Sequence, residues 1–84
     1  MGNQSSIFNL NTGERCLVEE LTNNENGYYR QRLLSQGVIP GVVLTVKRMS
    51  PFGDPIELLL PCGSSFVIRK QEVANIIKIR RLIE

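Results

Sequence analysis

Histidine is absent from this chain of 84 residues, and with it the side chain that most often serves as a general base or a metal ligand. Cysteine is scarce, and Cys16 and Cys62 alone fall short of the ligand set of a structural zinc site. No secretory signal is evident, so we do not expect a disulfide, and because both cysteines lie in apolar stretches we expect each to be a small buried hydrophobic residue. These absences argue against a catalytic centre, a bound cofactor and a dedicated metal site, and we expect none of them.

Long hydrophobic runs are also missing, because no apolar stretch approaches the ~20 residues that a membrane-spanning helix requires. The charge is nearly balanced, with 10 Lys and Arg against 8 Asp and Glu and a net charge of +2. The 3 phenylalanines and 2 tyrosines do not cluster with basic residues, apart from Tyr28 and Tyr29 beside Arg30, so no nucleic-acid surface is indicated. We expect a soluble, cytoplasmic protein that does not bind nucleic acid.

A chain of 84 residues makes one small domain. So small a core leaves little room for a ligand cleft, which usually encloses roughly 300 Å³ or more, and this favours binding over catalysis. The first six residues fit the short pattern for N-myristoylation, but no polybasic segment follows to supply the second signal that stable anchoring needs. We expect a flexible N-terminus over residues 1–6 and a single domain over residues 7–84.

Two kinds of apolar periodicity indicate the elements of this domain. Stretches in which apolar residues alternate, as in Ile56, Leu58 and Leu60, predict β-strands. Tyr29 and Leu33 share one helical face and predict a helix over residues 28–36, for which the asparagines before it can supply the N-cap. The strands are expected over 15–21, 42–49, 56–60, 65–68 and 76–82, and a single helical turn over 69–75.

Short strands at such regular spacing are typical of a small barrel. We therefore expect a mostly β protein, a small SH3-like β-barrel of about five strands. One short helix would follow the first strand, and a single helical turn would precede the last.

The turn between two of the apolar strands, from Pro51 to Pro55, is stiff. Its two prolines fix φ and remove two backbone donors, and Asp54 is held extended because it precedes a proline. Gly53 supplies the conformational freedom that the other turn residues lack. Such a loop would present Phe52 and Asp54 in one arrangement, unless Phe52 packs over the end of the barrel instead.

Glycine and proline indicate two further turns. Gly37 follows the expected helix at the position of a left-handed C-terminal cap. Pro40 presets its own backbone angle and Gly41 permits a positive one, so the chain turns sharply before the next strand. The expected structural turn residues are Gly37, Pro40, Gly41, Pro51, Gly53 and Pro55.

Four stretches of the chain together resemble the FeoA family. They occur in the order and near the spacing of that family, and the resemblance covers roughly residues 7–80. The four stretches are Arg32–Leu34, Gly37–Gly41, Pro51–Ile56 and Ile68–Ile76.

The resemblance implies an SH3-like barrel and a small cytoplasmic accessory protein of bacterial ferrous iron (Fe²⁺) uptake. The family's usual partner is FeoB, a membrane protein with a cytoplasmic GTP-binding domain, so contact with the membrane would be indirect. FeoA-like modules also occur fused to iron- or manganese-responsive repressors, which leaves a transition-metal-binding or metal-responsive regulatory domain as the alternative. Direct metal ligands would have to come from Asp54, Glu57, Cys62 and Glu72, which are scattered in the sequence.

Partner binding is expected at two places. Phe52 is an aromatic residue on a stiff loop, and such a residue loses little entropy when it binds. Phe52 and Asp54 form the first expected contact, and Tyr28 and Arg32 of the short helix form the second. We expect a protein-binding module that modulates its partner, and not an enzyme.

Overall fold

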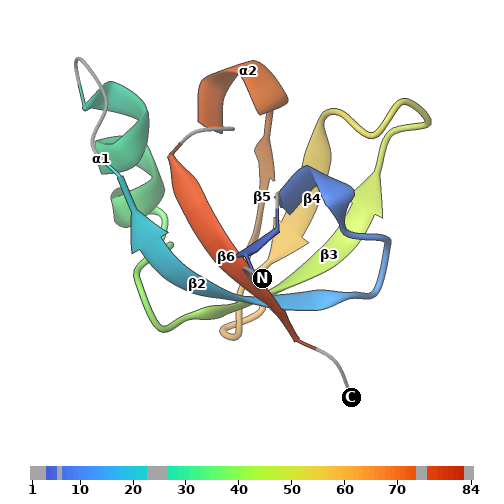
Figure 1. The fold of residues 1–84 in the computed structure, drawn as a ribbon, viewed down its shortest axis with the longest axis horizontal. Coiled ribbons are helices and arrows are strands. Elements are labelled where there is room, and N and C mark those ends of the chain that lie inside the picture. The colour runs from blue at the N-terminus through green and yellow to red at the C-terminus, as the bar shows by residue number, and fades with distance from the viewer. Residues whose placement is uncertain (1–3, 6, 23–26, 74–75, 83–84) are drawn as a thin grey trace.

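The structure is a computed structural model that describes residues 4–5, 7–22, 27–73 and 76–82. Buried and more exposed residues alternate along most of its strands. Within the described residues six strands form one antiparallel sheet, in the order β1-β6-β2-β3-β4-β5. The sheet curls around the core, and α1 and α2 lie at the same end of it (Figure 1). The elements in chain order are β1 (Gln4–Ser5), the 3-10 helix η1 (Ile7–Asn9), β2 (Arg15–Leu21), α1 (Tyr28–Ser35), β3 (Val43–Met49), β4 (Ile56–Leu59), β5 (Ser65–Ile68), α2 (Lys70–Val73) and β6 (Ile77–Leu82).

The mostly β prediction is confirmed, and each expected strand agrees with the structure to within one residue at either end. Strand β1 is a sixth strand that the sequence did not predict. Gln4 pairs with Arg80 and Ser5 pairs with Ile79, so these two residues of the expected N-terminal segment form a strand, while residues 1–3 and 6 lie outside the described part. Strand pairing is made by backbone groups, which is why these polar residues did not indicate a strand. Because β1 comes first, α1 follows the second strand and not the first.

The inward faces of the strands form the core. Ile56, Leu58 and Leu60 are all buried, as their alternation predicted, and so are Ile77 and Ile79 of the last strand. Helix α1 adds one buried side chain and covers one end of the core together with partly buried neighbours. The buried residues are Ile7, Leu10, Cys16, Val18, Leu21, Leu33, Val38, Leu44, Val46, Ile56, Leu58, Leu60, Phe66, Ile68, Ile76, Ile77 and Ile79.

Helix α1 is bounded by glycines at both ends. Its N-cap is Gly27 with a φ of 68°, and no side chain caps the helix there. The expected asparagine cap is therefore wrong, because a left-handed glycine leads the chain directly into the first turn, and residues 23–26 lie outside the described part. After the helix, Gly37 has a φ of 98° and the N–H of Val38 donates to the carbonyl of Leu33 at 3.0 Å, which is the pattern of a Schellman cap.

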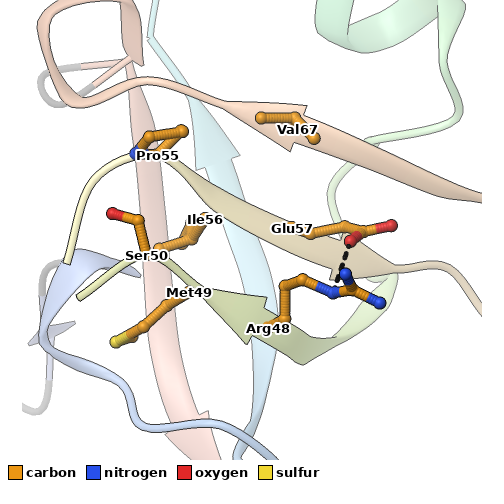
Figure 2. Close-up of a pocket in the computed structure, with 7 residues that line it drawn as sticks. All are labelled: Arg48, Met49, Ser50, Pro55, Ile56, Glu57 and Val67. Carbon is orange, nitrogen blue, oxygen red and sulfur yellow. Dashed lines mark ion pairs between the residues drawn. The ribbon is translucent and has the colours of Figure 1, made fainter. Parts of the chain in front are cut away.

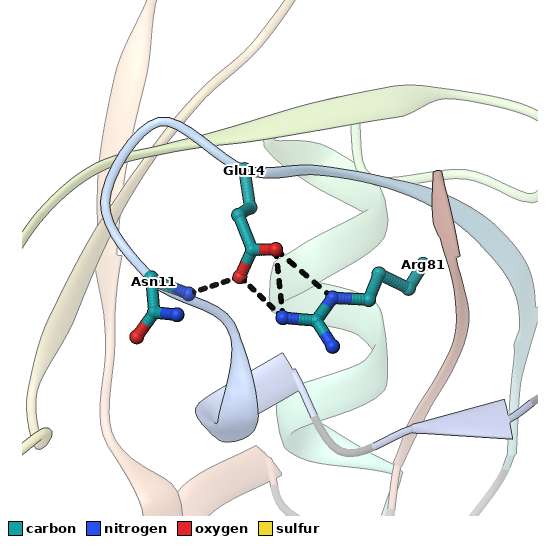
Figure 3. A network of polar contacts seen from close by, with 3 residues as sticks. All are labelled: Asn11, Glu14 and Arg81. Carbon is teal, nitrogen blue, oxygen red and sulfur yellow. Dashed lines mark hydrogen bonds and ion pairs between the residues drawn. The ribbon is translucent and has the colours of Figure 1, made fainter. Parts of the chain in front are cut away.

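The loop before β2 is fastened to the last strand by Glu14 and Arg81 (Figure 3). Arg81 Nη2 lies 2.7 Å from both carboxylate oxygens of Glu14, and Arg81 Nε lies 3.0 Å from Oε2. The backbone N–H of Asn11 donates to Glu14 Oε1 at 2.6 Å. These bonds favour the carboxylate, so the guanidinium of Arg81, followed by the Asn11 N–H, holds the pKa of Glu14 below its ordinary value of 4.5.

In the part of the chain that the structure describes, no helix is both long enough and apolar enough to cross a bilayer.

Candidate partner-binding surface

The turn between β3 and β4 is organised by Ser50. The backbone carbonyl of Ser50 accepts a hydrogen bond from Gly53 N–H at 2.8 Å, and the N–H of Ser50 donates to the carbonyl of Pro55 at 3.2 Å. Its hydroxyl accepts from Asp54 N–H at 3.1 Å and donates to the carbonyl of Asp54 at 2.7 Å. Gly53 has a φ of 80°, which is the left-handed conformation that glycine adopts without strain. The turn is therefore held by side-chain as well as backbone bonds.

Sequence reasoning missed the role of Ser50. The signal was available, because serine is favoured at the first position of a turn, where its hydroxyl can bond to backbone groups further along. The prolines predicted that residues 51–55 are stiff, but the hydrogen bonds of Ser50 hold the tip of the turn in place.

Phe52 stands at the tip of this turn and is 95% exposed. The structure therefore rejects the alternative in which Phe52 packs over the end of the barrel. An exposed phenylalanine keeps apolar area in water, and burying such a side chain is worth roughly 1.5–3 kcal/mol. Its exposure on a fixed turn makes Phe52 available to a partner.

Asp54 has a structural partner within the chain. Its Oδ1 accepts a hydrogen bond from the backbone N–H of Lys70 at 2.8 Å, which satisfies one of the free donors at the start of α2. Asp54 is otherwise exposed. Its expected role as a partner contact stays a prediction, and the structure adds a bond that positions the turn against α2.

A groove of about 200 Å³ lies on the outer surface at the base of the turn (Figure 2). This volume is smaller than the roughly 300 Å³ or more of typical ligand clefts, and the groove suits a single side chain better than a metabolite. The buried Ile56 belongs to its lining, while Val67 of β5 is 52% exposed. The lining residues are Arg48, Met49, Ser50, Pro55, Ile56, Glu57 and Val67.

Charged side chains meet on one side of this groove. A β-bulge in β3 falls between Val46 and Arg48, so that Lys47 and Arg48 both approach Glu57 of β4. Arg48 Nε lies 3.2 Å from Glu57 Oε1, Lys47 Nζ lies 3.7 Å from Oε2, and Ser65 Oγ donates to Oε2 at 2.9 Å. Two cations therefore share one carboxylate, which leaves positive charge at the rim.

The second expected contact lies elsewhere on the molecule. Tyr28 is 60% exposed at the start of α1, and its ring meets the ring of Tyr29 edge to face at a centroid distance of 5.1 Å. Arg32 is also exposed on α1. In Figure 1, α1 lies at the left and the turn between β3 and β4 at the upper right, with α2 between them. The structure therefore places Phe52 and Asp54 on one surface and Tyr28 and Arg32 on another.

Residues 40 and 41 shape the connection between α1 and β3. Gly41 has a φ of 97°, and its N–H donates to the carbonyl of Val18 at 2.7 Å. The N–H of Val42 closes the turn by donating to the carbonyl of Ile39 at 3.1 Å. Pro40 and Gly41 thus lead the chain from the helix cap into β3 beside β2.

The scattered metal-ligand candidates do not converge. Asp54 lies on the turn, Glu57 on β4 and Cys62 in the turn between β4 and β5, while the side chain of Glu72 lies outside the described part. Among the residues whose side chains are described, no three His, Cys, Asp or Glu come close enough to hold a metal ion. The donor set therefore gives no support to a metal site.

The two cysteines have opposite environments. Cys16 is buried, and burial raises the pKa of its thiol to about 11. Cys62 is exposed, and hydrogen bonds from Ser64 lower the pKa of its thiol. Both thiols are free in the structure. The expected burial is confirmed for Cys16 and wrong for Cys62, because Cys62 lies in the exposed turn between β4 and β5.

Comparison with known proteins gives the same fold. The model of the FeoA domain family matches residues 7–78. A FeoA-like protein from Clostridium acetobutylicum is 25% identical, with a TM-score of 0.78, and the alignment covers 100% of this chain and 93% of that one. The FeoA protein from Chlorobium tepidum is 32% identical, with a TM-score of 0.74 and coverage of 94% and 71%.

A third solved structure shows the fold at lower identity. The FeoA of Stenotrophomonas maltophilia was solved in complex with zinc and is described as an SH3 domain protein and a candidate activating factor of bacterial ferrous iron transport. It is 18% identical, with a TM-score of 0.71, and the alignment covers 95% of this chain and 89% of that one. The expected SH3-like architecture is confirmed.

Proposed function

The chain belongs to the FeoA family, and we propose from this premise that it is an accessory factor of ferrous iron uptake that acts by binding a protein partner. The names of its structural neighbours, an iron uptake regulatory protein among them, support the process. The partner we propose is a FeoB-like membrane protein, contacted through its cytoplasmic GTP-binding part. The protein would modulate this partner from the cytoplasmic side and would touch the membrane only through it.

One observation carries the proposal that the turn is the contact. Phe52 is 95% exposed, yet the turn that presents it is fixed by Ser50. Aromatic anchors on preorganised loops bind well because little conformational entropy is lost. A flexible loop, or a phenylalanine folded onto the barrel, would not have this property.

The groove beside the turn extends the same surface. Met49, Pro55 and Val67 give it apolar walls, while Arg48 gives it a charged rim. A partner residue could enter the groove while Phe52 enters a pocket of the partner. Binding of this kind, with a desolvated centre and a polar rim, is usual at protein interfaces.

The surface of α1 is the second place of contact in this proposal. Helix α1, which carries Tyr28 and Arg32, lies on the other side of α2 from the turn in Figure 1, so a partner must span the end of the barrel to touch both surfaces. We place the main contact at Phe52 because Tyr28 already packs against Tyr29, whereas Phe52 has almost no cover within the described chain.

Iron uptake by cells tests the function. In a strain that lacks this gene, we expect radioactive Fe²⁺ uptake to fall and to return when the wild-type gene is supplied. The variant Phe52→Ala should fail to restore uptake at equal protein level. Ile39→Ala is the matched control, because Ile39 is also an exposed apolar residue, 50% exposed, but lies on the loop after α1.

The outcomes separate the parts of the proposal. Normal uptake in the deletion strain would contradict a role in iron uptake. Full restoration by Phe52→Ala would keep the role but exclude the turn as its contact. Loss of restoration by both variants would point to a less specific surface than the one proposed.

A further inference from the structure

Strand β5 is an edge of the sheet. It stands last in the strand order and pairs with β4 on one side, and no strand among the described residues pairs with its other side. Exposure of the outward-facing side chains rises toward this edge, from the half-buried Thr45 and Leu59 to the exposed Ser65. The free side of β5 is thus unpaired by any strand of the described residues.

The hairpin register shows which backbone groups face the open side. The N–H of Leu60 donates to the carbonyl of Ser64 at 2.8 Å, so this pair is hydrogen-bonded. Hydrogen-bonded and non-bonded pairs alternate along an antiparallel ladder. Phe66, opposite Leu58, therefore turns its backbone groups toward β4, whereas Ser65 and Val67 turn theirs away from the sheet.

Within the strand itself, two of the usual protections against pairing with another chain are missing. Natural edge strands are commonly shielded by proline, by charged side chains or by a covering element. Residues 65–68 contain no proline and no charge, and Val67 is 52% exposed. The strand is short, at 4 residues, which limits its reach.

Positive charge gathers where β5 ends. Arg69 and Lys70 follow the strand directly, both are exposed, and neither forms an ion pair with another residue described in the structure. Nearby, Arg48 and Lys47 share the single carboxylate of Glu57. Asp54, which also lies here, is bound to the backbone of α2.

We propose that the open edge of β5 takes up an extended segment of a partner protein by strand addition. The segment would alternate apolar residues beside Val67 and would carry Asp or Glu beside Arg69 and Lys70. In the antiparallel orientation, these acidic residues precede the apolar ones. Main-chain bonds to Ser65 and Val67 supply affinity, and the charges set the register.

A second copy of the chain is a poorer occupant of this edge. Residues 65–68 of another copy contain no carboxylate, so they would leave Arg69 and Lys70 without counter-charges. An acidic extended segment supplies both hydrogen-bond partners for the outward backbone groups of β5 and carboxylates for Arg69 and Lys70.

The edge and the turn belong to one end of the molecule. Ile68 lies opposite Ile56, which immediately follows the turn, and Val67 lines the groove beside it. An antiparallel strand added to β5 would therefore have its acidic beginning nearest the turn and would run past the groove away from Phe52. The inference rests on the proposed function in one respect, namely that the partner is a protein.

A synthetic peptide tests the edge directly. The probe is the blocked peptide Glu-Asp-Val-Thr-Val-Thr-Val, titrated into the full chain labelled with ¹⁵N and followed by NMR. We expect the amide signals of Ser65, Val67 and Arg69 to shift, and hydrogen exchange at the two edge amides to slow. A peptide with two lysines in place of Glu and Asp should bind more weakly, by about tenfold or more, because its lysines lie beside the like charges of Arg69 and Lys70.

Variants of Val67 separate the backbone from the side chain. Val67→Pro removes the outward N–H without touching the bonds to β4, and proline is tolerated on edge strands. It should abolish binding, whereas the matched control Val67→Thr, which keeps the N–H and the shape, should bind the peptide. If Val67→Pro does not fold, a peptide that is N-methylated at the amides facing β5 makes the same test on the wild-type chain.

The inference fails if the edge amides do not respond, or if the lysine or N-methylated peptide binds as well as the probe. It also fails if the chain dimerises through β5 without peptide. Peptide binding at β5, together with normal iron uptake by Phe52→Ala, would overturn the role of the turn and leave the edge. Lost uptake in Phe52→Ala without peptide binding would overturn the edge alone.

Discussion

The carboxylate of Asp54 accepts a 2.8 Å hydrogen bond from the backbone N–H of Lys70, so the turn that carries Phe52 is tied to the start of α2. The two residues are 16 positions apart in sequence. This bond holds the turn, the end of β5 and α2 in one arrangement. The proposed binding surface depends on that arrangement as well as on the stiffness of the turn.

Removal of the Asp54 acceptor should lower stability. Asp54→Ala leaves the N–H of Lys70 without its partner, and loss of such a helix-capping bond costs about 1 kcal/mol of unfolding free energy. Asp54→Asn keeps an oxygen acceptor at the same position and should recover most of the loss. Urea denaturation of the three proteins measures this, and equal stabilities of the Ala and Asn variants would contradict the assigned bond.

The bond between Glu14 and Arg81 predicts a pH dependence. Its hydrogen bonds lower the pKa of Glu14 in the folded state, so the stability they contribute is present above the ordinary value of 4.5 and is lost as the pH falls through the folded pKa. Glu14→Gln should therefore melt at a lower temperature than the wild type at neutral pH. The difference should narrow as the medium becomes acidic.

Glu20→Gln is the control for this experiment. Glu20 is more exposed than Glu14 and lies 3.9 Å from Lys78, a single long contact in place of a bidentate one. Exposed pairs of this kind contribute little. Two results would show that the bidentate pair does not stabilise the fold. One is a difference in melting temperature between Glu14→Gln and wild type that stays constant with pH, and the other is an equal loss of melting temperature in Glu20→Gln.

The two thiols should react at different rates. Burial raises the pKa of Cys16 to about 11, whereas hydrogen bonds from Ser64 lower the pKa of the exposed Cys62. Only thiolates are alkylated readily, and a thiol must also be reached by the reagent. Iodoacetamide at neutral pH should label Cys62 in the folded protein and Cys16 only after unfolding, as peptide mass spectrometry would show. Labelling of Cys16 at a similar rate would mean that the core around it opens easily.

The sequence predicted those parts of the fold that local pattern controls. The alternation of Ile56, Leu58 and Leu60 identified a strand and its buried face, because a strand of this kind must turn its apolar residues to the core. Gly37 predicted the end of α1 for a similar reason, since few other residues adopt its backbone angle. Strand β1 had no such signal, because Gln4 and Ser5 pair through the backbone with β6.

The candidate site was only partly predictable, because it depends on contacts between distant segments. The prolines and Gly53 marked the turn, but nothing in the sequence shows that Asp54 reaches Lys70. The open edge of β5 follows from the strand order, which is a property of the whole sheet. The separation of α1 from the turn between β3 and β4 likewise appears only when α1 is placed on the barrel (Figure 1).

Binding to the purified FeoB-like partner tests the central claim most directly. Phe52→Ala should leave stability within about 0.5 kcal/mol of wild type, since Phe52 is 95% exposed. Its affinity for the partner, measured by biolayer interferometry, should fall by roughly 30-fold or more, as expected for a hot-spot aromatic that contributes about 2 kcal/mol. Tyr28→Ala, measured beside it, should fall less. An unchanged affinity for Phe52→Ala would contradict the claim that the partner binds at this turn.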